Sequence, residues 1–311
     1  MRAVDDLSYT VRRGECCAVI GESGSGKTVS ALSVLRLIPY PPGLIVGGEV
    51  LFNGEDLMQY TDEQMQKLRG KKISMIFQEP SAALNPVMTV GAQIGEAVML
   101  HDKLDKKAAR ARCLELLELV GIPSPEKRMD QYPFELSGGM QQRVMIAMAM
   151  SCRPEILIAD EPTTALDVTV QAQVLEQLNE IRKKTGTTMI IITHNLGIVA
   201  RYADSVKIMY GGKLVEQGPT REVFKDPRHP YTQGLIQAVP RLDRPRSEAL
   251  YTIQGEPPDM SRVPPQSCAF APRCPYATAE CREARPEHQA LGPGHSCACF
   301  HLDLTAKEGK A

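Results

Sequence analysis

Short runs of apolar residues alternate with helix-like patterns along the first 225 residues of the chain. A short apolar run bounded by turn residues predicts a strand that is buried on both faces. Such strands are predicted at Cys16–Ile20, Ile73–Phe77, Ile156–Ala159, Met189–Thr193 and Val206–Tyr210. Helices are predicted over Thr28–Ile38, Lys106–Val120 and Val168–Lys184. This alternation predicts the α/β fold class, with a largely parallel sheet and a ligand site at the carboxyl ends of its strands.

Two further patterns modify this basic α/β picture. Gly47–Gly54 and Lys213–Gly218 resemble short hairpin strands and predict a small antiparallel layer. Residues 79–150 are rich in helix formers and lack strand signals, so they predict a helical insertion.

Composition divides the chain near residue 225. Five of the nine cysteines lie within residues 268–299, and 12 of the 23 prolines lie within residues 227–293. We therefore predict two domains, a first one at 1–225 and a Pro- and Cys-rich C-terminal extension at 226–311.

Charge and hydropathy exclude several classes of protein. The formal net charge is −1, which does not favour nucleic acid as a partner. No apolar run approaches the roughly 20 residues that span a bilayer, and the first residues carry no signal-peptide pattern. We expect a cytosolic chain that can still dock on a membrane protein.

Residues 21–28 form a complete phosphate-binding motif, G-x-x-x-x-G-K-T, between a predicted strand and a predicted helix. Glycines let the backbone turn tightly and direct its N–H groups at phosphate oxygens, at the positive end of the helix. The lysine can reach the β- and γ-phosphates, and the threonine can bind Mg²⁺. The candidate nucleotide-binding residues are Gly21, Glu22, Ser23, Gly24, Ser25, Gly26, Lys27 and Thr28.

Two acids follow the predicted strand Ile156–Ala159. Asp160 ends the strand, where a carboxylate can hold Mg²⁺ through water. Glu161 is one residue further along and can orient or deprotonate an attacking water molecule. Adjacent acids at a strand end often form only a solvated turn, but the phosphate loop in the same chain favours the catalytic interpretation.

Together these motifs resemble the ATP-binding subunits of ABC transporters. Leu136–Gln141 resembles the ABC signature, through Ser137, Gly138 and Gly139, and residues 165–167 resemble the D-loop, through Asp167. By this resemblance Gln78 is the glutamine that contacts Mg²⁺, water and the transmembrane subunit, and His194 is the histidine that contacts the γ-phosphate. The resemblance covers about residues 1–225 and implies a P-loop ABC ATPase fold that uses ATP and Mg²⁺.

The same resemblance implies that the subunit works as one of a pair. The phosphate loop and the signature of one chain would face the signature and phosphate loop of a second ATPase subunit, head to tail. ATP binding would close this dimer, and hydrolysis would release it.

One part of the family pattern is not found in this sequence. Family members carry a strand with an adenine-stacking aromatic residue well upstream of the phosphate loop, whereas only 20 residues precede Gly21 here. The first strand and its aromatic residue are therefore expected to be missing. Tyr9 is expected to be an inward-facing strand residue.

The cysteines of the extension favour a metal site, because disulfides are rare in cytosolic proteins. Thiolates suit zinc or an iron–sulfur cluster, and a reduced cluster of thiols without metal is the further alternative. Cys16, Cys17, Cys113 and Cys152 are expected to be small buried residues. Residues 229–232 and 273–275 resemble the C-terminal region of di- and oligopeptide importer ATPases. That resemblance implies a 4Fe–4S cluster on Cys268, Cys274, Cys281 and Cys299, with Cys297 as a spare thiol.

The predicted function is ATP hydrolysis that powers import of di- or oligopeptides. The resemblance implies a second ATPase subunit forming a heterodimer, two transmembrane permease subunits and, indirectly, an extracytoplasmic substrate-binding protein. It places the chain at the cytoplasmic face of the cell membrane. The alternatives are the same role for nickel, glutathione or another small solute, a non-transport ABC ATPase, and a metal-sensing interaction protein. Because all nucleotide motifs precede residue 200, changes in the cysteines are expected to spare ATPase activity.

Overall fold

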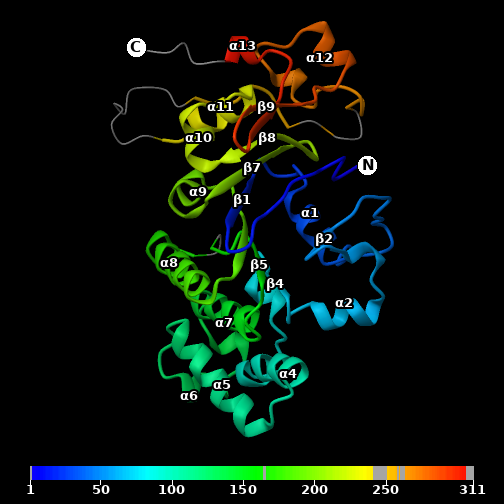
Figure 1. Ribbon diagram of the computed structural model, residues 1–311. Coiled ribbons are helices and arrows are strands. Elements are labelled where there is room, and N and C mark those ends of the chain that lie inside the picture. Colours follow the sequence, from blue (N-terminus) through cyan, green and yellow to red (C-terminus); the bar gives the residue numbers. More distant parts are fainter. Residues whose placement is uncertain (1, 164–165, 241–250, 258, 260–262, 306–311) are drawn as a thin grey trace. The chain divides into compact units, whose positions relative to one another are not determined.

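The computed structural model describes all residues except 1, 164–165, 241–250, 258, 260–262 and 306–311. The chain separates into two compact units (Figure 1). One contains residues 1–10, 16–30 and 193–311, and the other contains residues 11–15 and 31–192. The first is called the loop unit and the second the insertion unit.

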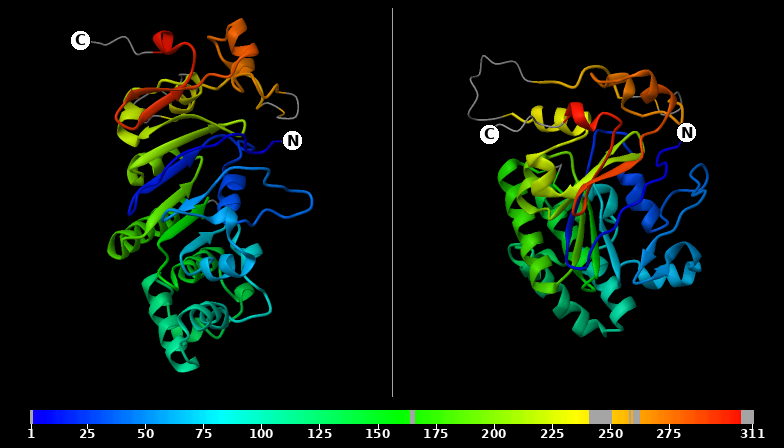
Figure 2. Two further views of the ribbon diagram at one scale, coloured as in Figure 1. Left: turned by 45° about the vertical axis from the view of Figure 1, so that its right-hand side comes forward. Right: turned by 45° about the horizontal axis from the view of Figure 1, so that its top comes forward.

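The loop unit is built on a mixed sheet. The fully buried strand β1 (Cys16–Ile20) pairs in parallel with β7 (Ser205–Tyr210), and β7 pairs antiparallel with β8 (Lys213–Pro219). The hairpin of β9 (His288–Gly292) and β10 (His295–Ala298) lies beside β8 (Figures 1 and 2), because β10 pairs antiparallel with β8. Its helices are the start of α1 (Lys27–Val34), α9 (Leu196–Tyr202), α10 (Thr220–Lys225), α11 (Pro230–Gln237), α12 (Ala279–Glu283) and α13 (Leu302–Thr305).

The insertion unit has a parallel sheet of three strands, β4 (Ile73–Ile76), β5 (Ile156–Asp160) and β6 (Thr188–Ile192). A separate two-stranded antiparallel sheet pairs β2 (Leu51–Phe52) with β3 (Glu55–Asp56). Helix α2 (Asp62–Leu68) begins with a capping box, in which Thr61 and Gln64 satisfy each other's backbone N–H groups. Helix α8 (Val168–Thr185) lies between β5 and β6 in the sequence and contacts α7.

Residues 79–150 are helical, as the sequence predicts, and contain no strand. Figure 1 shows these helices together at one end of the insertion unit, where α4, α5 and α7 pack on one another. They are α3 (Pro80–Ala83), α4 (Val90–Asp102), α5 (Lys106–Leu119), α6 (Pro125–Arg128) and α7 (Gly138–Met150). Asp105 caps α5 by accepting a hydrogen bond from the Ala108 N–H.

Two predictions from the sequence differ from the structure. Lys213–Gly218 belongs to β8 of the larger sheet and not to a small antiparallel layer, because it continues the hairpin from β7. Among the described residues before Cys16, none is in a strand, so Tyr9 is not a strand residue. The domain boundary near residue 225 stays a prediction, and β10 of the extension pairs with β8 of the loop unit.

The extension is joined to β7 by an aromatic cluster of Tyr210, Tyr231 and Phe270, all buried. The ring centroids of Tyr210 lie 4.6 Å from Tyr231 and 5.1 Å from Phe270, in edge-on geometry. His229 lies against the same cluster, and its ring nitrogen Nδ1 accepts a hydrogen bond from the Tyr231 N–H. Burial lowers the pKa of His229 to about 4, so this imidazole is neutral near pH 7.

Candidate nucleotide site and cysteine region

The phosphate loop follows β1 directly and ends at the first residue of α1, Lys27. Gly26 has φ +93°, and a Cβ at this position would lie 2.3 Å from the backbone oxygen of Ala3. A side chain is therefore excluded there by both conformation and space. The strand, loop and helix arrangement is the one that presents backbone N–H groups to an anion.

The side chain of Lys27 lies across the phosphate loop. Its Nζ donates to the carbonyl oxygens of Gly21 and Glu22, both at 2.9 Å, and reaches Ser25 Oγ at 3.5 Å. Lys27 is buried, and its neighbour Thr28 is half-buried at the helix start. An ammonium group held over the loop is suitably placed to bind a phosphate.

In the insertion unit, the structure brings Gln78 and Glu161 together. The Nε2 of Gln78, two residues after β4, donates to Glu161 Oε2 at 3.1 Å. Ile76 is the register partner of Ala159, so the two strands end at the same edge of the sheet. Asp160, the last residue of β5, is buried, which suits a carboxylate that holds a metal ion rather than one in a solvated turn.

The backbone of Glu161 has φ +43°, which is uncommon for a residue with a side chain. Its N–H donates to the carbonyl oxygen of Ile192 at 2.9 Å, which holds the turn after β5 against the end of β6. This left-handed turn is local strain at a candidate catalytic residue, a combination that is common in active sites.

The signature residues begin a helix in the insertion unit. Ser137 is the N-cap of α7, and its carbonyl oxygen accepts hydrogen bonds from the N–H groups of Met140 and Gln141, both at 2.9 Å. Ser137 and Gly138 are exposed. Asp167 caps α8 by accepting from the Val170 N–H at 3.0 Å. A Cβ on Gly139 would meet the Val170 side chain at 3.6 Å, so the signature lies against the start of α8.

His194 belongs to the loop unit and follows β6 by two residues. It is exposed, and the next residue, Asn195, caps α9 by accepting from the N–H groups of Gly197 and Ile198. The candidates therefore form two groups. The phosphate loop and His194 lie in the loop unit, whereas Gln78, Ser137, Gly138, Gly139, Asp160, Glu161 and Asp167 lie in the insertion unit.

Several cysteines of the extension interact with one another in the structure. The Cys268 N–H donates to the Cys281 carbonyl oxygen at 2.9 Å, and the His301 N–H donates to Cys299 Sγ at 3.4 Å. In the part of the chain that the structure describes, no group of three or more His, Cys, Asp or Glu side chains is arranged to hold a metal ion. The structure therefore gives no support to the predicted 4Fe–4S cluster.

Burial affects the chemistry of these thiols. It raises the pKa of Cys274 to about 11, and it also raises the pKa of Cys268, Cys297 and Cys299. Burial thus favours the protonated form of these four thiols over the thiolate, which is the form that binds a metal. The remaining cysteines, Cys16, Cys17, Cys113 and Cys152, are buried as the sequence predicts.

The sequence motifs do not include Arg273 and Tyr231 as parts of the nucleotide site, yet both contact Glu22 of the phosphate loop. One signal in the sequence could have indicated such a partner. Glu22 is an acid inside a loop that binds anions. Because its carboxylate would repel an anionic ligand, a nearby cation is expected to neutralise it. His301 was also not predicted, although its Nε2 lies 3.6 Å from Cys281 Sγ.

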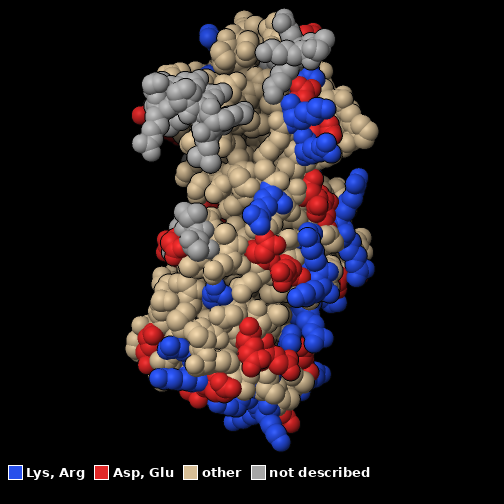
Figure 3. Space-filling model, turned by 90° about the vertical axis from the view of Figure 1, so that its left-hand side faces the viewer, with Lys and Arg blue, Asp and Glu red and all other residues tan. Residues whose placement is uncertain are grey.

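No helix within the described ranges is both long enough and apolar enough to cross a membrane. On the face drawn in Figure 3, basic and acidic side chains are interspersed, with no large area of one sign.

Comparison with known proteins identifies relatives of both halves of the chain. Residues 4–164 match the family model of the ABC transporter, and residues 215–281 match that of the oligopeptide/dipeptide transporter C-terminal region. The chain is 52% identical to the oligopeptide transport ATP-binding protein OppD of Bacillus subtilis, over 89% of this chain and 77% of the relative. It is 48% identical to the dipeptide transport ATP-binding protein DppD of the same organism, over 99% of this chain and 91% of the relative.

Solved structures give the same result for the fold. A dimeric ATP-binding cassette, MJ0796, in a post-hydrolysis state with ADP and Pi, superposes with a TM-score of 0.63 at 25% identity, covering 70% of this chain and 91% of that one. CbiO1 of Clostridium perfringens, part of the transporter complex cbiONQ, superposes with a TM-score of 0.61 at 30% identity, covering 72% and 84%. The P-loop ABC ATPase fold predicted from the sequence is confirmed.

Proposed function

The chain belongs to the ABC transporter family, among the ATP-binding proteins of oligopeptide and dipeptide transport, and on this basis we propose that it hydrolyses ATP to drive peptide import. The match of residues 215–281 to the oligopeptide/dipeptide transporter C-terminal region is the observation that supports peptides as the substrate class. The phosphate loop by itself does not, because it occurs in ATPases of many functions. The ATPase assignment is further supported by Lys27 over the loop and by the Gln78–Glu161 contact.

We assign the following roles to the residues of the nucleotide site. Lys27 and the loop N–H groups bind the phosphates, and Glu161 accepts a proton from the attacking water molecule while Gln78 orients the Glu161 carboxylate. Thr28, Gln78 and Asp160 would hold Mg²⁺, which favours hard oxygen ligands such as these and neutralises phosphate charge. His194 contacts the γ-phosphate. Ser137, Gly138, Gly139 and Asp167 act on the nucleotide of the partner subunit.

The proposed assembly contains a second ATPase subunit, in a heterodimer, and two permease subunits at the cytoplasmic face of the cell membrane. An extracytoplasmic binding protein would deliver the substrate. The dimeric relatives support the pairing of two ATPase subunits. Nucleic acid is not proposed as a partner, in line with the net charge of −1.

Co-purification and transport test this function directly. The chain, expressed with its neighbouring gene products, should purify with two membrane-spanning subunits, and vesicles of this complex should take up labelled di- or oligopeptide only with Mg-ATP. Uptake of nickel or glutathione in place of peptide would correct the substrate class. A purified ATPase without any membrane partner would contradict the transport function.

We also propose, on the pattern of the sequence alone, that Cys268, Cys274, Cys281 and Cys299 hold a 4Fe–4S cluster. Protein purified without oxygen should then be brown and contain about four irons per chain. Changing any of these four cysteines to Ser should remove the colour. Cys297→Ser is the matched control that should keep it, because Cys297 lies within β10 opposite Glu216. Stoichiometric zinc, or no metal, would refute the cluster.

A further inference from the structure

Arg273 of the C-terminal extension forms a two-pronged ion pair with Glu22 of the phosphate loop. Its Nη1 donates to Glu22 Oε2 at 2.6 Å, and its Nη2 donates to Glu22 Oε1 at 3.3 Å. The Arg273 side chain is 6% exposed and that of Glu22 is 24% exposed. A bidentate guanidinium–carboxylate pair with one partner buried is stronger and more directional than an exposed ion pair.

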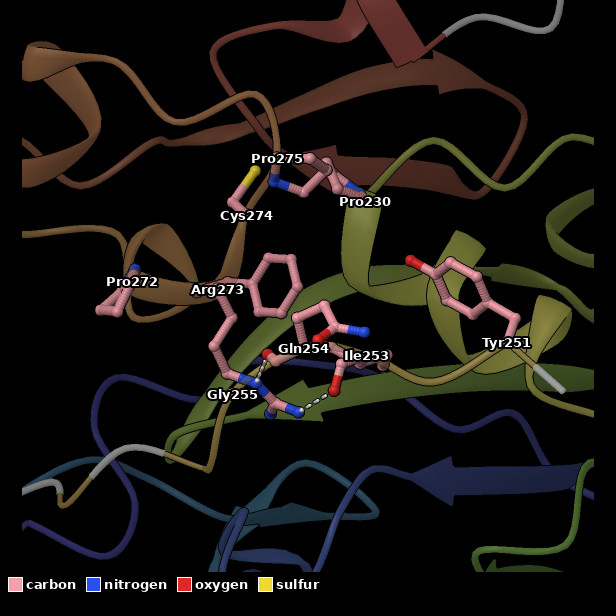
Figure 4. A pocket seen from close by; sticks show the side chains of 10 residues that line it. Pro230, Tyr251, Ile253, Gln254, Gly255, Pro272, Arg273, Cys274 and Pro275 are labelled. Atoms are coloured by element: carbon pink, nitrogen blue, oxygen red, sulfur yellow. Dashed lines mark hydrogen bonds between the residues drawn. The ribbon is translucent and has the colours of Figure 1, made fainter. Parts of the chain in front are cut away.

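The guanidinium of Arg273 is itself fixed by other groups. Its Nε donates to the carbonyl oxygen of Gln254 at 2.9 Å, and its Nη2 donates to that of Ile253 at 3.3 Å (Figure 4). Its Nη1 also donates to the Tyr210 hydroxyl at 3.2 Å. Arg273 ends a short 3₁₀ turn, Ala271–Arg273, which follows Phe270 of the aromatic cluster. These contacts hold the guanidinium in the orientation in which it pairs with Glu22.

Arg273 and its neighbour Cys274 both line a cavity with a volume of about 310 Å³. Figure 4 shows Arg273 at one wall of this cavity, with its guanidinium directed at the backbone of residues 253–254. The guanidinium is occupied by these contacts, so the cavity presents no uncommitted cation to a ligand.

Glu22 is linked in turn to the rest of the phosphate loop. Its N–H donates to the Tyr231 hydroxyl at 2.7 Å, and its carbonyl oxygen accepts from Lys27 Nζ at 2.9 Å. A single residue thus connects the extension to the lysine that binds phosphate. Gly21, Gly24 and Gly26 give the loop little restraint of its own, so external contacts decide how well it is ordered.

The charge of Glu22 gives the ion pair a second effect. A carboxylate in a loop that receives a triphosphate repels the ligand unless a cation neutralises it and holds it aside. Arg273 of the loop unit supplies this cation through its ion pair with Glu22.

We propose that Arg273 is a positioning residue for ATP binding, acting through Glu22, and that the extension is therefore part of the support of the nucleotide site. This inference rests on the proposed role of the phosphate loop in binding ATP. Changes in the cysteines of the extension are expected to spare ATPase activity, whereas Arg273 contacts the phosphate loop directly.

The test measures Mg-ATP affinity of the full-length chain by equilibrium binding. Arg273→Gln should weaken binding roughly fivefold to tenfold, the size expected for the net contribution of a typical hydrogen bond, because Arg273 acts on the ligand only through Glu22. Arg285→Gln is the matched control, because Arg285 is another arginine of the extension whose ion pair is with Asp6, at 3.2 Å, outside the phosphate loop. It should bind Mg-ATP as the parent protein does.

A double variant separates positioning from general damage. If Arg273 acts through Glu22, adding Glu22→Gln to Arg273→Gln should restore part of the lost affinity, because the unbalanced carboxylate is then absent. If the two changes weaken binding additively, or if Arg273→Gln binds like the parent, the inference is wrong. Should Arg273→Gln fail to fold, Arg273→Lys, which keeps the charge but loses the fork, should show a smaller loss of affinity.

Lys27→Ala distinguishes failure of this inference from failure of the proposed function. Loss of ATP binding in Lys27→Ala with normal binding in Arg273→Gln would refute the role of Arg273 alone. Normal binding in Lys27→Ala would refute the phosphate loop assignment itself.

Discussion

Replacing Glu161 by Gln is expected to leave ATP binding intact and to lower ATP turnover by roughly 10²–10⁴-fold, the usual loss for a positioned general base. Glutamine keeps the size of the side chain and can still accept the hydrogen bond from Gln78 Nε2, which measures 3.1 Å here. It cannot accept a proton from water. The change therefore removes the chemistry while it preserves the geometry of the turn after β5.

The measurement is steady-state ATPase activity of the assembled transporter, together with nucleotide binding by the same preparation. Glu155→Gln is a suitable control, because Glu155 immediately precedes the first residue of β5, at the end of the strand away from Glu161. Its Oε1 pairs with Lys72 Nζ on the surface, at 2.6 Å. Its turnover should equal that of the parent. Near-normal turnover of Glu161→Gln would contradict the role of this residue as the base.

Replacing Glu216 by Leu is expected to lower the free energy of unfolding of the loop unit by about 3–5 kcal/mol, as when one member of a buried polar network is removed. Glu216 lies in β8 and is 0% exposed. Its Oε1 accepts from the Arg228 N–H and pairs with His295 Nε2, both at 2.9 Å, and its Oε2 accepts from the His229 N–H at 2.9 Å. Leucine fills similar space but leaves these buried partners without an acceptor.

Denaturant unfolding would measure this loss, and limited proteolysis would localise it, because cleavage should appear first in the extension that Glu216 anchors. The same change at Glu222, an exposed residue of α10, should alter stability by no more than about 0.5 kcal/mol. Equal stability of Glu216→Leu and the parent would show that the hydrogen bonds of Glu216 are replaced by others.

Local patterns in the sequence were sufficient to predict the buried strands β1, β4, β5, β6 and β7, the helical insertion and the family. The predicted strand Ile156–Ala159 differs from β5 by only one residue, because four consecutive apolar residues can be buried on both faces only in the middle of a sheet. The Gln78–Glu161 contact agrees with the rule that parallel strands end at one edge. These features depend on residues close in sequence or on a known order of motifs.

Contacts between distant segments were not predictable in the same way. Arg273 and Glu22 are 251 residues apart in the sequence. The paired strands β8 and β10 are also far apart in the sequence, because the Pro-rich segment lies between them. The composition changes near residue 225, yet β10 after this point pairs with β8 before it. Proline content reflects local restriction of the backbone and does not indicate which surface a segment covers. The cysteine spacing likewise indicated thiols in one region but not their geometry.

The hairpin of β9 and β10 has a consequence for any shortened form of this protein. β10 hydrogen-bonds to β8 through Ser296–Gln217 and Cys297–Glu216, so removing the last residues would leave one side of β8 without its partner. A strand edge whose N–H and C=O groups are unpaired is a template for pairing with other chains and promotes aggregation. Proteins ending before His288 should therefore self-associate. A truncated protein would then lose ATP binding through insolubility, whereas a point change such as Arg273→Gln tests the nucleotide site itself.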